Sequence, residues 1–120
     1  MLEIIDVPAD HVIGLQMDGK INQDDMNKAL NPIQSVLKVN DTVNIYLEIE
    51  SFNGISLGAI YSELTTAIPN AHRFKKEAIV SDQTSLKKWV QLGNRFWWNG
   101  EAKFFTTQER QKALDWIQAQ

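Results

Sequence analysis

The stretch over residues 42–68 constrains the fold more than any other part of the sequence. From Val43 to Ile49 apolar residues alternate with mostly polar ones, a period of two that is typical of a strand with one well-buried face. After a short polar loop, apolar residues recur at steps of three and four from Leu57 to Ile68, which predicts a helix packed on that sheet. We expect Gly54 to relieve the backbone in the turn and Ser56 to be the helix N-cap.

The rest of the chain adds strands and helices around this unit. The short connection between the first two strands predicts an antiparallel hairpin, whereas strands separated by helices predict right-handed crossovers and parallel pairing. The polar alternation of the central strand predicts that most helices lie on one face of the sheet and leave the other partly open. In the first helix, Pro32 predicts a kink or a break near Asn31. The other expected strands are Leu2–Val7, His11–Asp18, Glu77–Ser81 and Ala102–Phe105, and the other helices are expected to begin at Asn22, at 82–85 and at Thr106.

Length and composition limit the class of protein. A chain of 120 residues fits a single domain over 1–120 with a sizeable core. The formal net charge of -3 argues against nucleic-acid binding, which needs a basic face. There is no cysteine, so disulfides and thiolate metal sites are excluded. Without a basic segment followed by an apolar run, and without a long uncharged apolar run, we expect no signal peptide, no transmembrane segment and a cytoplasmic protein.

The residues that could carry chemistry do not form a catalytic set. The acidic pair at 24–25 falls in the first turn of a helix, where acids are stabilising. Glu48 and Glu50 share the polar side of the central strand, about 7 Å apart, but the sequence offers no polar partners beside them. His11 and His72 lack the spacing of metal ligands. We therefore expect no enzymatic activity, no metal and no cofactor, and a solvated or interface role for the two glutamates.

Three consecutive aromatic rings near the end of the third helix are the least ordinary feature. Successive side chains diverge in a helix or a strand, so at least one of these rings is expected near the surface. Such a ring could line an apolar pocket, anchor a protein interface or sit among lipid headgroups, and the alternative is a cap over the end of the sheet. The ligand or interface candidates are Tyr61, Trp89, Arg95, Phe96, Trp97 and Trp98.

Basic residues fall close to these rings in the sequence. The lysine pairs at 75–76 and 87–88, together with Arg73 and Arg95, would give a basic rim compatible with transient contact with anionic lipid. Four lysines on solvated helix and strand faces are the alternative.

Several motifs together resemble one known family. In chain order they are Met17–Ile21, Phe52–Gly54 with Leu57–Ala59, Glu77–Asp82 and Ala102–Phe105. Their order and spacing resemble the STAS fold of anti-sigma-factor antagonists and, more narrowly, the bacterial SpoIIAA-like family, which is grouped with STAS and CRAL-TRIO-type domains. The resemblance implies an α/β fold with a mixed, mostly parallel β-sheet opened by an antiparallel hairpin, with helices mainly on one face.

The resemblance also allows one test of regulation. Phosphorylated antagonists of this fold carry a modifiable serine in an Asp-Ser-Ser-Gly-Leu-Gly-like turn before the second helix. If Leu57-Gly58 matches the Leu-Gly of that turn, the modified position falls on Ile55, and this disfavours phosphorylation. The candidates in this loop and helix start are Ser51, Asn53, Gly54 and Ser56.

These observations favour a non-enzymatic bacterial binding or regulatory domain. Its expected partner is another protein, a second copy in a homodimer, or an apolar small molecule held under the second and third helices. One alternative is lipid or membrane-surface binding of the CRAL-TRIO type, and a second, disfavoured alternative is a phosphorylation-regulated anti-sigma-factor antagonist.

Overall fold

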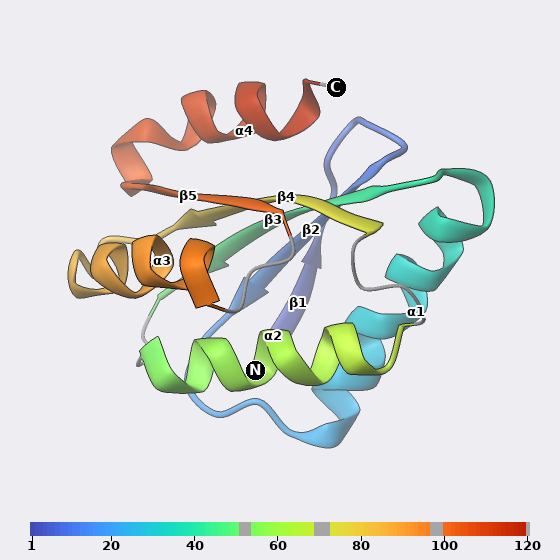
Figure 1. Cartoon of the computed structure of the whole chain (residues 1–120), viewed down its shortest axis with the longest axis horizontal. Coiled ribbons are helices and arrows are strands. Elements are labelled where there is room, and N and C mark those ends of the chain that lie inside the picture. Colours follow the sequence, from blue (N-terminus) through green and yellow to red (C-terminus); the bar gives the residue numbers. More distant parts are fainter. Residues whose placement is uncertain (51–53, 69–72, 97–99, 120) are drawn as a thin grey trace.

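The computed structural model describes residues 1–50, 54–68, 73–96 and 100–119, with side chains described throughout except at 54–57 and 95–96. Strands and helices alternate along most of this chain (Figure 1). The elements in chain order are β1 (Leu2–Ile5), β2 (Val12–Met17), α1 (Gln23–Val39), β3 (Val43–Ile49), α2 (Gly54–Thr66), β4 (Phe74–Val80), α3 (Ser85–Phe96), β5 (Glu101–Phe105), a short 3-10 helix (Thr107–Glu109) and α4 (Arg110–Gln118).

The strands form one five-stranded sheet in the order β1-β2-β3-β4-β5. β1 runs antiparallel to β2, with Leu2 opposite Met17, and the remaining neighbours are parallel. β3 lies in the middle, with Leu47 between Leu15 of β2 and Ile79 of β4. The expected mixed sheet, its opening hairpin and its central strand are all confirmed.

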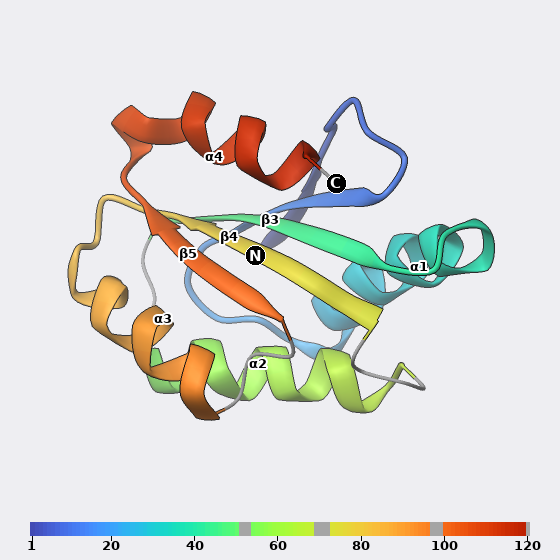
Figure 2. The same cartoon turned by 45° about the horizontal axis from the view of Figure 1, so that its top comes forward.

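The helices α1, α2 and α3 lie together on one face of the sheet, and α4 lies across the other (Figures 1 and 2). Each of the first three helices joins a strand to its next parallel neighbour, so right-handed crossovers in one direction place them on the same side. The expectation of helices mainly on one face is confirmed. On the second face, α4 packs over β3 and β4, and Val7 from the β1–β2 connection joins the apolar cluster beneath it.

Each layer encloses its own apolar cluster. The cluster under α1–α3 takes Leu15 and Met17 from β2 and Ile45 and Leu47 from β3. The smaller cluster under α4 is built around Tyr46, Val80, Ala113 and Ile117, with Phe105 and Trp116 half-buried at its margin.

The start of α1 is capped as the sequence indicates, but its middle is not broken. Asn22 and Asp25 form a reciprocal capping box at the start, as expected from an Asn N-cap. Of the kink or break expected near Asn31, the break is wrong, because α1 runs continuously from Gln23 to Val39. Proline removes one backbone donor, and the buried stripe that includes Ala29 and Ile33 on either side of it holds the helix together.

The first two strands are shorter than expected, with bounds Leu2–Ile5 and Val12–Met17, and the starts of two other elements also differ from the sequence prediction. α2 begins at Gly54, so Ser56 lies inside its first turn, and the prediction of an N-cap at Ser56 is wrong. β4 begins at Phe74 rather than Glu77, because Phe74 is fully buried against Tyr61 and extends the ladder with β3.

The outer edges of the sheet are partly closed by side chains. On β5, the Asn94 amide of α3 donates to the Ala102 carbonyl and accepts from the Ala102 N–H, both at 2.7 Å. On β1, the Lys28 ammonium donates to the Leu2 carbonyl at 3.2 Å. Backbone groups at an edge invite pairing with another chain, and these side chains occupy some of them.

Candidate functional site

A buried carboxylate lies between the sheet and α2. Glu77 of β4 is only 1% exposed, and its Oε1 accepts a hydrogen bond from the hydroxyl of Tyr61 on α2 at 2.7 Å. Its second oxygen, Oε2, has no hydrogen-bond partner among the described residues. Buried polar atoms are satisfied in nearly all proteins, so a buried carboxylate oxygen without a partner marks a place where a donor is missing.

This carboxylate faces a small cavity of about 20 Å³. The cavity lies above strands β2, β3 and β4 and below α2, and apart from Glu77 and the Tyr61 hydroxyl its walls are apolar. A space of this size holds about one water molecule. The lining side chains are Leu15, Met17, Ile45, Leu47, Ile60, Tyr61, Leu64, Phe74, Glu77 and Ile79.

Burial raises the pKa of Glu77 from 4.5 to about 7, and the hydrogen bond from Tyr61 opposes this shift only in part. The charged form is disfavoured because the surrounding walls cannot solvate it. Charged neighbours are not among the causes of this shift. The site can therefore accept a proton or a hydrogen bond near neutral pH, in surroundings that favour apolar groups.

A second, polar site lies on the opposite face, where α4 begins. Arg110 binds the Glu48 carboxylate through Nε at 3.1 Å and through NH2 at 3.0 Å, and the hydroxyl of buried Tyr46 donates to the other Glu48 oxygen at 3.1 Å. Burial, followed by the charge of Glu48, raises the pKa of Tyr46. The expectation that Glu48 lacks polar partners is wrong, because its partners come from its own strand and from a helix 62 residues away.

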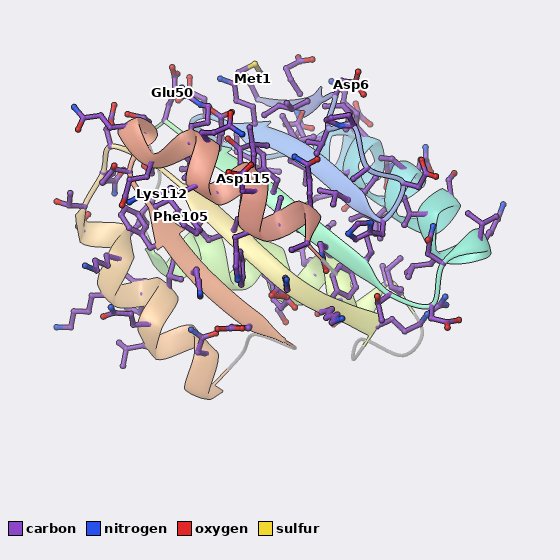
Figure 3. All side chains as sticks on the ribbon, turned by 90° about the horizontal axis from the view of Figure 1, so that it is seen from above. Met1, Asp6, Glu50, Phe105, Lys112 and Asp115 are labelled. Atoms are coloured by element: carbon purple, nitrogen blue, oxygen red, sulfur yellow. The ribbon has the colours of Figure 1, made fainter. Side chains whose placement is uncertain are left out.

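An open hollow of about 450 Å³ adjoins this ion pair at the carboxyl ends of β2, β3 and β4. Its charged groups are Glu48, Glu50, Asp82 and Arg110, and Thr107 donates a hydrogen bond to Asp82. Seen from the α4 side, Glu50 lies at this end of the sheet (Figure 3). Because the charge of Glu48 is compensated by Arg110, the ion pair holds α4 on the sheet, and Glu48 and Glu50 do not form an acid–base pair.

The candidates for a ligand or an interface are not all brought together. Tyr61 is buried beside Glu77, and Trp89 is half-buried on α3. Arg95 and Phe96 belong to the last turn of α3, and nothing is described of their side chains. Trp97 and Trp98 lie outside the described residues, as do Ser51 and Asn53, whereas Gly54 and Ser56 lie in the first turn of α2.

Two residues of the expected basic rim bind carbonyl groups at the ends of helices. The Arg73 guanidinium donates to the carbonyls of Leu37, Asn40 and Asp41 at the end of α1, at 2.6 to 2.9 Å. The Lys76 ammonium donates to the carbonyls of Trp116 and Ala119 at the end of α4. These two cations serve the last carbonyls of helices, which are left unsatisfied within the helix itself.

Metal chemistry finds no support in the described part of the chain, where no group of three or more histidine and acidic side chains is placed to hold an ion. His11 is half-buried beside the start of β3, and His72 lies outside the described residues. Among the described helices, none combines the length and the apolar character needed to cross a bilayer.

Sequence reasoning missed Glu77, the residue on which the site depends. The signal was present: Glu77 opens the apolar run Ala78-Ile79-Val80 of a predicted strand, and its parity places it with Ile79 on one face. A charged residue in phase with a buried face is the pattern that indicates a buried ionisable group.

A mixed sheet that opens with a hairpin and carries its crossover helices on one face defines a STAS-type domain, a class of regulatory and binding domains. The sequence model of the SpoIIAA-like family matches residues 12–118. The chain therefore belongs to the SpoIIAA-like family. No curated protein and no solved structure matches it.

Proposed function

We propose that this chain is a non-enzymatic binding domain for a small apolar molecule, which it holds between the sheet and α2. One observation carries the proposal: Glu77 is buried in an apolar cavity with one carboxylate oxygen unpartnered among the described residues. Pockets for small molecules are typically apolar with a few polar groups that fix orientation, and the Glu77–Tyr61 pair has that composition. A cytoplasmic location agrees with this role.

The size of the cavity indicates that binding involves movement of α2. A volume of about 20 Å³ is too small for a molecule of several carbon atoms. The floor of the cavity is the central sheet, whereas its roof consists of Ile60, Tyr61 and Leu64 on a single helix. We therefore expect a ligand to enter by displacing the helix rather than the strands.

Among the described residues, this site does not contain the groups that a hydrolase or transferase needs. A carboxylate and a phenol at 2.7 Å form one proton-sharing pair. Nucleophilic catalysis needs an activated nucleophile and a base that is oriented by a third group, and the cavity walls are otherwise apolar. We therefore assign the pair to ligand recognition.

Binding can be tested with Nile red, a neutral apolar dye whose fluorescence rises in apolar surroundings. The wild-type chain is expected to bind the dye saturably, and Leu64→Trp is expected to lose this binding, because Leu64 lines the cavity and a larger ring fills it. Ala59→Trp is the matched control, since Ala59 is exposed on the same helix. Equal dye binding by both variants, with both folded by circular dichroism, would contradict the proposed site.

A further inference from the structure

We propose that the cavity under α2 selects apolar amines, with Glu77 as the residue that binds the ammonium group. This inference rests on the proposed function, because it names the class of ligand for that same cavity. The head group of the ligand is thereby specified as an ammonium group, and its apolar part is defined only by contact with the cavity walls.

The described walls of the cavity offer no donor to one oxygen of Glu77. Glu77 Oε1 already accepts from Tyr61, while Oε2 has no donor among the described residues. The other lining residues are aliphatic side chains and Phe74, none of which can donate to a carboxylate. A ligand that fills this place therefore has to bring a donor of its own.

Charge then decides between the possible donors. When Glu77 is ionised, its negative charge has no cation near it in the described part of the structure, since charged neighbours are absent from the causes of its pKa shift. An ammonium group brings both a donor and the missing positive charge, and hydrogen bonds between ionised groups are about twice as strong as neutral ones. An alcohol brings the donor alone. A carboxylate ligand brings neither and adds a like charge, which a buried site disfavours.

The shape of the site agrees with a head group placed at the sheet and a chain that extends under the helix. Glu77 lies on β4, next to the central strand, and the apolar walls spread from it over β2 and β3. Tyr61 binds Oε1 of the carboxylate from the helix side, so Oε2 is the oxygen left for the ligand.

The closing experiment compares three ligands with one alkyl chain: octylamine, 1-octanol and octanoate. Calorimetric titration of the wild-type chain at pH 8, where Glu77 is mostly ionised, is expected to give affinities in the order amine, alcohol, acid. The amine is expected to bind about tenfold or more tightly than octanoate, the ratio that one charge-assisted hydrogen bond gives. At pH 5.5, where Glu77 is mostly protonated, the advantage of the amine is expected to shrink several-fold, while octanol binding stays constant. Glu77 and Tyr61 are the titratable groups that line the cavity, so Glu77→Gln is expected to remove both the preference and its pH dependence.

The outcomes separate this inference from the proposed function. Saturable binding of all three ligands with the alcohol or the acid as the tightest would overturn the amine proposal alone. An unchanged order in folded Glu77→Gln would do the same. If none of the three ligands and no Nile red binds, the proposed function fails and the amine proposal fails with it. The series on the wild-type chain needs no variant, so the test holds even if Glu77→Gln does not fold.

Discussion

The position of Glu77 in an apolar layer and the charge of its carboxylate have opposing requirements, since an apolar layer disfavours a charge. Its chain position in β4 makes it part of the apolar layer beneath α2, and its carboxylate is unfavourable there in the charged form. The hydroxyl of Tyr61 satisfies one oxygen and leaves the other to a ligand, a water or a proton. Stability and binding are therefore linked through the same atom.

The stability of the chain is expected to depend on pH through this residue. The pKa of Glu77 is raised from 4.5 to about 7 in the folded state, so the folded state holds its proton more tightly. The resulting stabilisation is fully present below about pH 4.5 and is lost as the pH rises through 7. Between pH 4.5 and 8 we expect the free energy of unfolding of the wild type to fall by about 3 kcal/mol relative to Glu77→Gln.

Urea unfolding of both chains at pH 5, 6, 7 and 8 measures this difference. Glu63→Gln is the control, because Glu63 is an exposed carboxylate on α2 and is expected to follow the wild type at every pH. Parallel pH curves for the wild type and Glu77→Gln would show that burial does not hold the proton on Glu77.

The side-chain contacts of single residues were also the feature that the sequence predicted least well. It identified Asn22 as the N-cap of α1, an interaction between residues only three positions apart. It missed the ion pair between Glu48 and Arg110 and the carbonyl partners of Arg73 and Lys76, because each of these contacts joins segments more than 30 residues apart. Local spacing carries no information about such pairs until the topology has placed the elements side by side.

Among the elements, the pair formed by α3 and β5 shows how a helix can finish a sheet. Asn94 meets both backbone groups of Ala102, as the next strand would, and α3 packs closely along β5. Gly100, just before β5, lies so near the backbone of Lys75 that an added Cβ would clash with the Lys75 carbonyl oxygen. The start of this edge strand is therefore held from two sides.

Removal of the Asn94 amide is expected to weaken this edge. Asn94→Ala leaves the N–H and the carbonyl of Ala102 without their side-chain partners, which costs about 1–3 kcal/mol in the free energy of unfolding. It also exposes backbone groups that can pair with another chain, so more self-association is expected. Urea unfolding and light scattering measure the two effects.

Gln91→Ala is the matched control for this prediction, because Gln91 is exposed one turn earlier on the same helix. It is expected to keep the wild-type stability and the wild-type scattering. Equal behaviour of the two variants would mean that the amide does not protect the edge.

At the scale of elements, periodicity predicted the types correctly and the boundaries less well. The strand from Val43 to Ile49 was read from alternation alone, because one of its faces packs against apolar side chains throughout. The start of α2 was predicted too late in the chain. Glycine has a low helix propensity and was assigned to the turn, but Gly54 is the first residue of the helix. The break at Pro32 was wrong for a related reason, since packing on both sides outweighs one missing donor.

For the whole molecule, the order of elements was sufficient to predict the topology. Strands joined by helices permit few arrangements once crossovers are right-handed, and the short first connection fixed the hairpin. The position of the site was not predictable to the same extent. The predicted pocket lay under the second and third helices, and the cavity beside Glu77 lies in that layer, under α2. Trp97 and Trp98 lie outside the described residues and leave that part of the prediction open.

Membrane-surface binding is the alternative function, and it depends on the cations that the surface of the molecule offers to anionic lipid. Arg73 and Lys76 are engaged at helix ends, which leaves fewer cations for anionic lipid than the sequence suggested. We therefore expect no co-sedimentation of the wild-type chain with phosphatidylserine-containing vesicles at low salt. Sedimentation of the wild type, and its loss in a Trp97→Ala, Trp98→Ala double variant, would instead favour a lipid-surface role.

The sheet order has a consequence for how the chain is made. Each strand lies beside the one that precedes it in the sequence, so during synthesis the sheet can widen in one direction, and no later segment has to be inserted between two strands already in place. The residues that line the cavity fall between Leu15 and Ile79. The described walls of the proposed binding site can thus be complete on the nascent chain while α3, β5 and α4 are still leaving the ribosome.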